Sequence, residues 1–133
     1  MEFHANFHLG DTPSAFPDAP YCGNTLSIGL PLPDPADFTG EFVLLIKARQ
    51  VETWGNSMGH KISLGGQLLP ERLKDIGNQN EPDEFEFTIE RSTYETIYQS
   101  PAPHLLAIEV ELLPNGLSDD FIMTSFGYRV ESA

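Results

Sequence analysis

Apolar and polar residues alternate along much of this chain, in segments separated by Pro, Gly, Asn and Asp. A period of two residues is typical of a β-strand with one buried face. The clearest case is EFEFTIE at 84–90, in which Phe85, Phe87 and Ile89 fall on one face. Further strands are expected at 2–9, 25–30, 60–64, 105–113 and 119–130. The pattern therefore predicts a mostly β protein.

Two segments depart from simple alternation. EFVLLIKARQV at 41–51 is apolar on both faces over five residues, which favours a central strand of a sandwich or one packed under a loop. RSTYETIYQ at 91–99 fits one short helix, with Ser92 as N-cap and Glu95 completing a capping box. The proline-rich stretches at 11–24 and 31–40 are expected to be loops.

The number of strands and the length of the chain set the fold class. A chain of 133 residues fits one domain, and about seven strands with little helix are typical of a sandwich. We expect residues 1–133 to form one all-β domain. It is predicted to be an antiparallel β-sandwich of the jelly-roll type with at most one or two short helical turns.

Three stretches of the sequence resemble a known superfold. GHKISLGGQLL, then FEFTIE, then LLAIEVELLPNGLSDDFIMTSFGYRVE are similar to the C-terminal two-thirds of galactose-binding-domain-like jelly rolls. Gly65-Gly66 stands where Asn-Gly is common in that group, which keeps the turn and loses the Asn side chain. Members include carbohydrate-binding modules, adhesive and assembly domains, and noncatalytic appendages of enzymes, so the resemblance does not choose among these functions.

Charge and composition limit the classes of partner that the protein is expected to bind. Seven Lys and Arg against 20 Asp and Glu give a net charge of −13, which repels nucleic acid phosphates and anionic lipids. The sequence shows no signal-peptide pattern and no apolar run near the ~20 residues of a membrane span. We therefore expect a soluble protein, cytoplasmic by default, with no nucleic acid or membrane partner. The lone Cys22 excludes an internal disulfide and a cysteine-based metal cluster.

Two motifs resemble a catalytic site and a metal site, but the surrounding sequence favours neither function. Residues 55–59, GNSMG, match the G-x-S-x-G pattern around Ser57, and His60 follows. A nucleophile elbow needs a strand before the serine and a helix after it, whereas here a strand follows, so we expect no enzyme. His4 and His8 share one face of a strand but lie roughly 13 Å apart, too far to bind one zinc ion. They are expected to be exposed.

Asp119 and Asp120 stand where the last strand begins, and two interpretations remain open. Asp at such a position commonly accepts hydrogen bonds from backbone amides of a turn. The pair could also bind calcium if the turn NGLSDD adds carbonyl oxygens. No other cofactor is expected.

The order of strands places the loops in space. If each strand runs opposite to the one before it, alternate loops share one end of the sandwich. One end then gathers loops 10–23, 50–60 and 90–104, and the other gathers loops 31–40, 65–83 and 113–120, which are acidic. The first end carries the candidate ligand-binding residues Trp54, Asn56, His60, Tyr94 and Tyr98.

Rings mixed with amides and imidazoles suit the binding of a sugar or a peptide. The alternative is that Trp54 caps the core and that Tyr94 and Tyr98, four residues apart, form the buried stripe of a helix. We expect a noncatalytic binding module with a carbohydrate as the leading ligand. A structural or assembly component that contacts other proteins is the second hypothesis, and the sequence does not indicate the oligomeric state.

Overall fold

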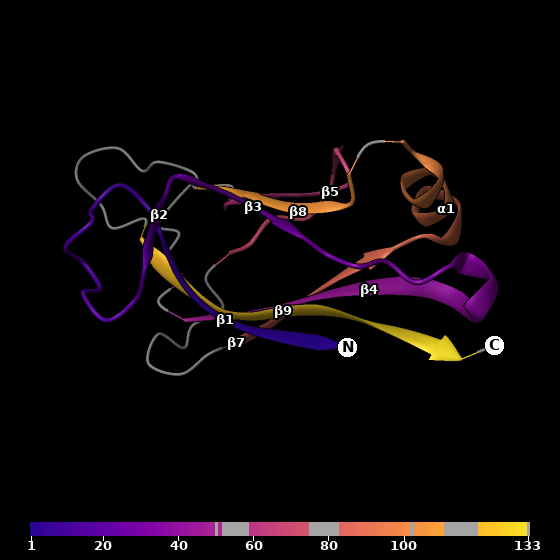
Figure 1. Ribbon diagram of the computed structural model, residues 1–133, viewed down its shortest axis with the longest axis horizontal. Coiled ribbons are helices and arrows are strands. Elements are labelled where there is room, and N and C mark those ends of the chain that lie inside the picture. Colours follow the sequence, from indigo (N-terminus) through magenta and orange to yellow (C-terminus); the bar gives the residue numbers. More distant parts are fainter. Residues whose placement is uncertain (50, 52–58, 75–82, 102, 111–119, 133) are drawn as a thin grey trace.

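Two β-sheets pack face to face and form the body of the protein (Figure 1). The computed structural model describes residues 1–49, 51, 59–74, 83–101, 103–110 and 120–132. The elements are β1 (Glu2–Leu9), β2 (Tyr21–Gly23), β3 (Thr25–Gly29), the 3-10 helix η1 (Pro35–Asp37), β4 (Phe38–Arg49), β5 (Lys61–Leu64), β6 (Gln67–Leu68), β7 (Asp83–Ile89), α1 (Arg91–Gln99), β8 (Leu105–Glu109) and β9 (Phe121–Ser132). The prediction of an all-β sandwich is confirmed.

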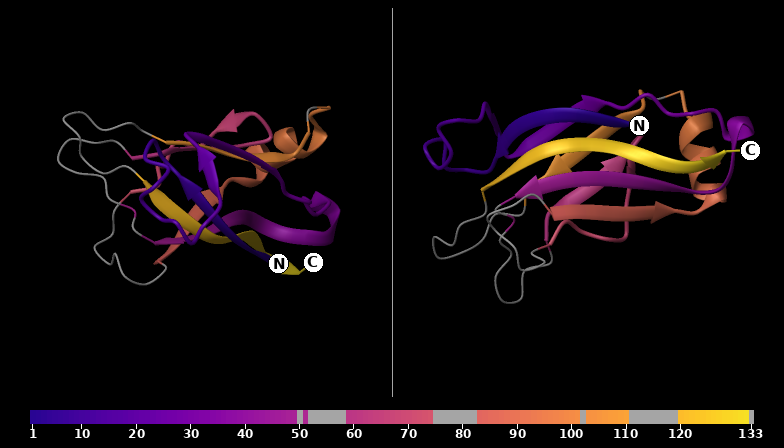
Figure 2. Two further views of the ribbon diagram at one scale, coloured as in Figure 1. Left: turned by 60° about the vertical axis from the view of Figure 1, so that its left-hand side comes forward. Right: turned by 90° about the horizontal axis from the view of Figure 1, so that it is seen from below.

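The larger sheet has five strands in the order β2-β1-β9-β4-β7, and the smaller has four in the order β3-β8-β5-β6. Figure 2 shows β1, β9, β4 and β7 side by side when the larger sheet is seen from below. The described pairs are antiparallel except for β1 and β2, which are parallel. Strand β9, the last in the sequence, therefore lies between β1 and β4.

The core lies between the two sheets and follows the period-two pattern. Phe85, Phe87 and Ile89 of β7 are buried, as the alternation predicts. Leu106 and Ile108 of β8 face them across the sandwich with Ile62 and Leu64 of the neighbouring strand. Burial of such side chains stabilises the fold by roughly 1.5–3 kcal/mol each.

Helix α1 closes one end of the sandwich beside the segment that leads into β4 (Figure 1). The helix begins at Arg91 with Glu90 as N-cap, and no side chain caps it, so the predicted capping box at Ser92 is wrong. Instead, the Arg91 guanidinium donates to the carbonyl oxygens of Phe38 and Pro35 and lies 4.7 Å from the Phe38 ring centroid. A tertiary contact fixes the helix start where a local cap was expected. No helix in the described part of the chain is long and apolar enough to cross a membrane.

Candidate functional site

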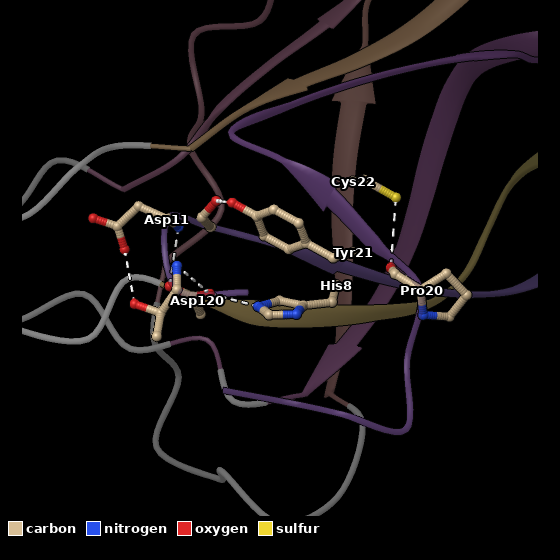
Figure 3. Close-up of polar contacts among 8 residues, drawn as sticks. His8, Asp11, Pro20, Tyr21, Cys22 and Asp120 are labelled. Carbon is tan, nitrogen blue, oxygen red and sulfur yellow. Dashed lines mark hydrogen bonds and ion pairs between the residues drawn. The ribbon is translucent and has the colours of Figure 1, made fainter. Parts of the chain in front are cut away.

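A buried histidine–aspartate pair joins the first strand to the last. His8 Nε2 lies 2.5 Å from Asp120 Oδ2, and both side chains are almost completely buried (Figure 3). His8 is the residue of β1 opposite Ile122 of β9, and Asp120 directly precedes β9. The prediction that His8 is exposed is therefore wrong, whereas His4 is exposed as expected. The strand pattern placed His8 on the polar face correctly, but the loop after β1 folds back and covers that face.

The Asp120 carboxylate also holds the start of this covering loop. Its oxygens accept hydrogen bonds from the backbone amides of Asp11, at 3.2 Å, and Thr12, at 3.1 Å. Gly10 makes this approach possible, because a Cβ atom at that position would lie 2.1 Å from Asp120 Cγ. Its φ of +145° is a further reason for glycine. Asp120 is thus an anchor for a turn, one of the two interpretations left open by the sequence.

Aromatic rings complete the enclosure of His8. Its ring meets the edge or face of Phe16 and Tyr21 at centroid distances of 5.1 and 4.9 Å. The Tyr21 hydroxyl donates to the Gly10 carbonyl at 2.6 Å (Figure 3). With both members of the pair buried, a substrate in solvent cannot reach the imidazole in this arrangement. The cluster fastens the loop to the sheet.

Of the two proposed metal ligands, the structure describes one. Asp119 lies outside the described residues. Asp120 directs both carboxylate oxygens to protein donors, as described above. Within the described ranges, no three His, Cys, Asp or Glu side chains gather closely enough to hold an ion. Calcium binding stays a prediction that the described geometry does not support.

The candidate ligand-binding residues that the structure describes do not form one exposed platform. Trp54 and Asn56 lie outside the described residues. His60 is fully buried, with its ring stacked on Phe121 at 4.7 Å. Tyr94 is fully buried and stacks on Phe42 at 4.6 Å, and its hydroxyl donates to the Pro33 carbonyl. Tyr98 is partly buried and packs against the core. Tyr94 and Tyr98 thus belong to the inward side of α1, the alternative raised by their spacing.

The predicted grouping of loops is also wrong, and a short strand explains the error. Loop 90–104 packs beside 31–38 through the Tyr94 and Arg91 contacts, not beside 10–23. Asp120 contacts loop 10–23 instead of the 31–40 end. The sequence analysis treated 65–83 as a single loop, whereas β6 pairs back onto β5 after Gly65-Gly66. That hairpin reverses the chain once more, so both loop 90–104 and Asp120 lie at the opposite end from the one predicted.

The outer face of the five-stranded sheet is charged, and several of its charges are paired. Lys47 Nζ lies 3.4 Å from Glu2 Oε1 and 3.8 Å from Glu84 Oε2. Arg129 donates to Glu86 at 2.9 Å, and this hydrogen bond, helped by the positive charge, lowers the pKa of Glu86 below its ordinary value. Exposed pairs of this kind are screened by solvent and contribute little to stability. The ladder is typical of a solvated surface.

A hollow of about 510 Å³ lies on the same face, where β4 bulges beside β9. Its lining consists of Gly40, Glu41, Val43, Thr88, Arg129, Val130 and Glu131. None of these side chains is aromatic, so the hollow offers no ring on which a sugar could stack.

The outer face of the four-stranded sheet differs sharply from the charged one. Its outward positions, here called the small-residue face, are Thr25, Ser27, Gly29, Lys61, Ser63, Leu68, Leu105, Ala107 and Glu109. Lys61 and Glu109 are its only charged residues and stand directly opposite each other. Leu68 and Leu105 are 50% and 37% exposed.

Comparison with known proteins found no relationship. No protein-family model, no characterised protein and no solved structure matches this chain. The function must therefore be inferred from the geometry alone.

The sequence analysis overlooked both His8–Asp120 and the small-residue face. The pair joins residues 112 positions apart, and nothing local to either residue signals the contact. The face had a visible signal, because Ser27, Ser63 and Ala107 alternate with core residues. Only the strand register shows that these three residues stand in one row.

Proposed function

We propose that this chain is a noncatalytic β-sandwich module that binds another protein through its small-residue face. The single observation that carries the proposal is the contrast between the two outer sheet faces. One bears a ladder of paired charges, and the other bears one Lys, one Glu and two exposed leucines among small side chains.

Charge depletion and exposed leucines both support contact with a protein. The centre of a protein interface is poor in charged residues relative to the rest of the surface. This depletion is notable in a chain with 20 acidic residues among 133. Small outward side chains also allow the backbone of a second surface to approach closely, as in the packing of two sheets face to face. These features favour the assembly hypothesis over carbohydrate binding.

The carbohydrate hypothesis loses support because His60 and Tyr94 are buried. It now depends on Trp54 and Asn56, outside the described residues, and on the partly buried Tyr98. A glycan array screened with the wild-type chain and with Trp54→Ala tests it directly. Specific glycan binding that Trp54→Ala abolishes would favour the carbohydrate hypothesis over the present proposal.

Site-specific photocrosslinking tests the proposed face. A photoreactive phenylalanine analogue replaces Ser27 on the small-residue face or, as a matched control, Thr88 on the outer face of β7, and both positions are exposed. We expect a defined covalent adduct from Ser27 in cells that make the protein, identified by mass spectrometry, and none from Thr88. Absence of an adduct from Ser27, or the same adducts from both positions, contradicts the proposal.

A further inference from the structure

We infer that the small-residue face binds the same face of a second copy of this chain, an inference that rests on the proposed function. Two features of the face support this inference: its strand register, and the placement of its two charges and two leucines.

The small-residue face consists of cross-strand rows of directly opposed residues. The register joins β3 to β8, β8 to β5 and β5 to β6 without a shift. Outward residues that are directly opposed on neighbouring strands therefore form rows across the sheet, and the next row lies two residues further along each strand. The rows are Thr25, Glu109 and Lys61; Ser27, Ala107, Ser63 and Leu68; Gly29 and Leu105.

The two charges of this face are placed for twofold pairing. Consider a twofold axis in the plane of contact, parallel to the strands and midway between β5 and β8. The rotation places β5 of one copy over β8 of the other. Lys61 then faces Glu109 of the second copy, and Glu109 faces Lys61 of that copy, so one symmetric contact makes two opposite-charge pairs. Neither residue forms an ion pair within the described part of the chain, so both are available.

The sizes of the side chains fit the same rotation. It places β6 over β3, so that the exposed Leu68 lies over Ser27 of the second copy, in the same row. Ser63 lies over Ala107, a pair of small residues at the centre. A large side chain at one edge thus meets a small one at the other, as interdigitating sheet faces require.

Net charge limits where on their surfaces two copies of the chain can meet. Two copies carrying a charge of −13 each repel one another over most of their surface. The small-residue face carries one positive and one negative charge, so a contact through this face adds no net like charge to the interface. A basic partner would instead be drawn to the acidic surface elsewhere on the molecule.

The size of the face sets the expected strength. Four strands about 4.8 Å apart, with rows about 6.7 Å apart, span roughly 15 Å by 15 Å. Such an area is smaller than the ~800 Å² per partner of a standard interface, so the association should be weak and dependent on concentration.

Sedimentation equilibrium of the full chain tests the inference. We expect the average mass to rise from the 14.8 kDa of the monomer toward twice that value between about 10 μM and about 1 mM, the range of weak interfaces. A mass that stays at 14.8 kDa throughout overturns the inference.

Two variants locate the contact. Ala107→Glu places a charge at the centre of the face and should weaken dimerisation by at least about tenfold. The dimer would then bury glutamates that have no partner of opposite charge, which is unfavourable. Thr88→Glu adds the same charge to the other sheet and should leave the dissociation constant unchanged. Equal effects of the two variants would place the contact elsewhere and contradict the inference.

The charge pair provides a rescue experiment. Lys61→Glu alone should weaken dimerisation, because it sets glutamates against each other across the twofold axis. Adding Glu109→Lys restores opposite charges and should restore most of the affinity. A double variant no better than the single variant contradicts the arrangement, provided that circular dichroism shows both variants to be folded.

The photocrosslinking described above separates the two proposals. An adduct of Ser27 with a second copy of the chain supports both. An adduct with a different protein, together with a monomeric mass, overturns the second-copy inference and leaves the proposed function standing. No adduct from Ser27 contradicts the proposed function as well.

Discussion

His8 Nε2 and Asp120 Oδ2 lie 2.5 Å apart in the interior, although 112 positions separate the residues in the sequence. Through the amides of Asp11 and Thr12, the same carboxylate ties the loop after β1 to the start of β9. One side chain therefore connects a strand, a loop and the strand that pairs with it. The stability of this end of the sandwich should depend on that carboxylate more than on any exposed acid.

Asp120→Ala should lower the free energy of unfolding by about 3 kcal/mol or more. It leaves the buried His8 imidazole without its carboxylate partner and removes the acceptor of two backbone amides. Urea denaturation measures the change. Asp18→Ala is the matched control, since Asp18 is exposed, and should change stability by less than about 0.5 kcal/mol. A loss at Asp120 as small as that of the control would show that the pair does not stabilise the fold.

Gly10→Ala should destabilise the protein more than Gly23→Ala. Both glycines have positive φ, at +145° and +85°, so both substitutions strain the backbone. Only at Gly10 would the new Cβ atom collide with Asp120, whereas nothing lies within 4 Å at Gly23. The difference between the two urea midpoints isolates the collision. Equal midpoints would mean that the carboxylate moves aside at little cost.

Tyr94→Ala should cost roughly 3–5 kcal/mol, as truncation of a buried aromatic side chain does. Tyr98→Ala, four residues along the same helix, removes a ring that is only partly buried and should cost clearly less. Thermal or urea unfolding of the two variants gives the comparison. The opposite order would mean that α1 docks through its other side.

Tyr94 also predicts how stability changes at alkaline pH. Burial, followed by the nearby Tyr128, Tyr98 and Asp34, raises the pKa of the Tyr94 hydroxyl far above its ordinary value. The unfolded chain releases this proton at about pH 10 and the folded chain does not. The stability that the protonated Tyr94 hydroxyl gives the folded state is therefore complete below about pH 10. It is lost as the pH rises toward the folded pKa. Tyr94→Phe should show a smaller alkaline loss than wild type in urea melts, and an unchanged slope would be inconsistent with this assignment.

Glu86 should titrate below its ordinary range because Arg129 donates a hydrogen bond to it and adds positive charge. A lowered folded pKa contributes stability that is present above the unfolded value of about 4.3 and is lost as the pH falls through the folded pKa. Carboxyl NMR titration of wild type and Arg129→Gln measures the effect. We expect the Glu86 midpoint to rise in the variant, whereas an unchanged midpoint would exclude Arg129 as the cause.

The sequence predicts the core well because core burial follows a local period. Phe85, Phe87 and Ile89 alternate with charged or polar residues, and all three are buried. The helix at 91–99 was also predicted with the correct bounds. Each of these features is set by residues within a few positions of one another.

Long-range features were predicted poorly, because no local pattern encodes them. Strand β6 has two residues, too few for any periodicity, yet its reversal of direction places loop 90–104 at the other end of the sandwich. The burial of His8 depends on a loop that folds over it and on Asp120, far away in the chain. A carboxylate beginning a strand has the same local sequence whether it faces water or a histidine.

The position of β9 between β1 and β4 has a consequence for synthesis. Strands β4 and β7 can pair as soon as both have left the ribosome. Strand β1 pairs with β2, but only β9 joins these two strands to the rest of their sheet. Sheets dominated by such distant pairings form slowly, because a long loop must close before any contact rewards it. Until β9 emerges, the apolar side of β1, with Phe3, Phe7 and Leu9, has no sheet to join. The apolar side of β1 therefore stays exposed until β9 has been synthesised, and this transient exposure favours aggregation of the unfinished chain.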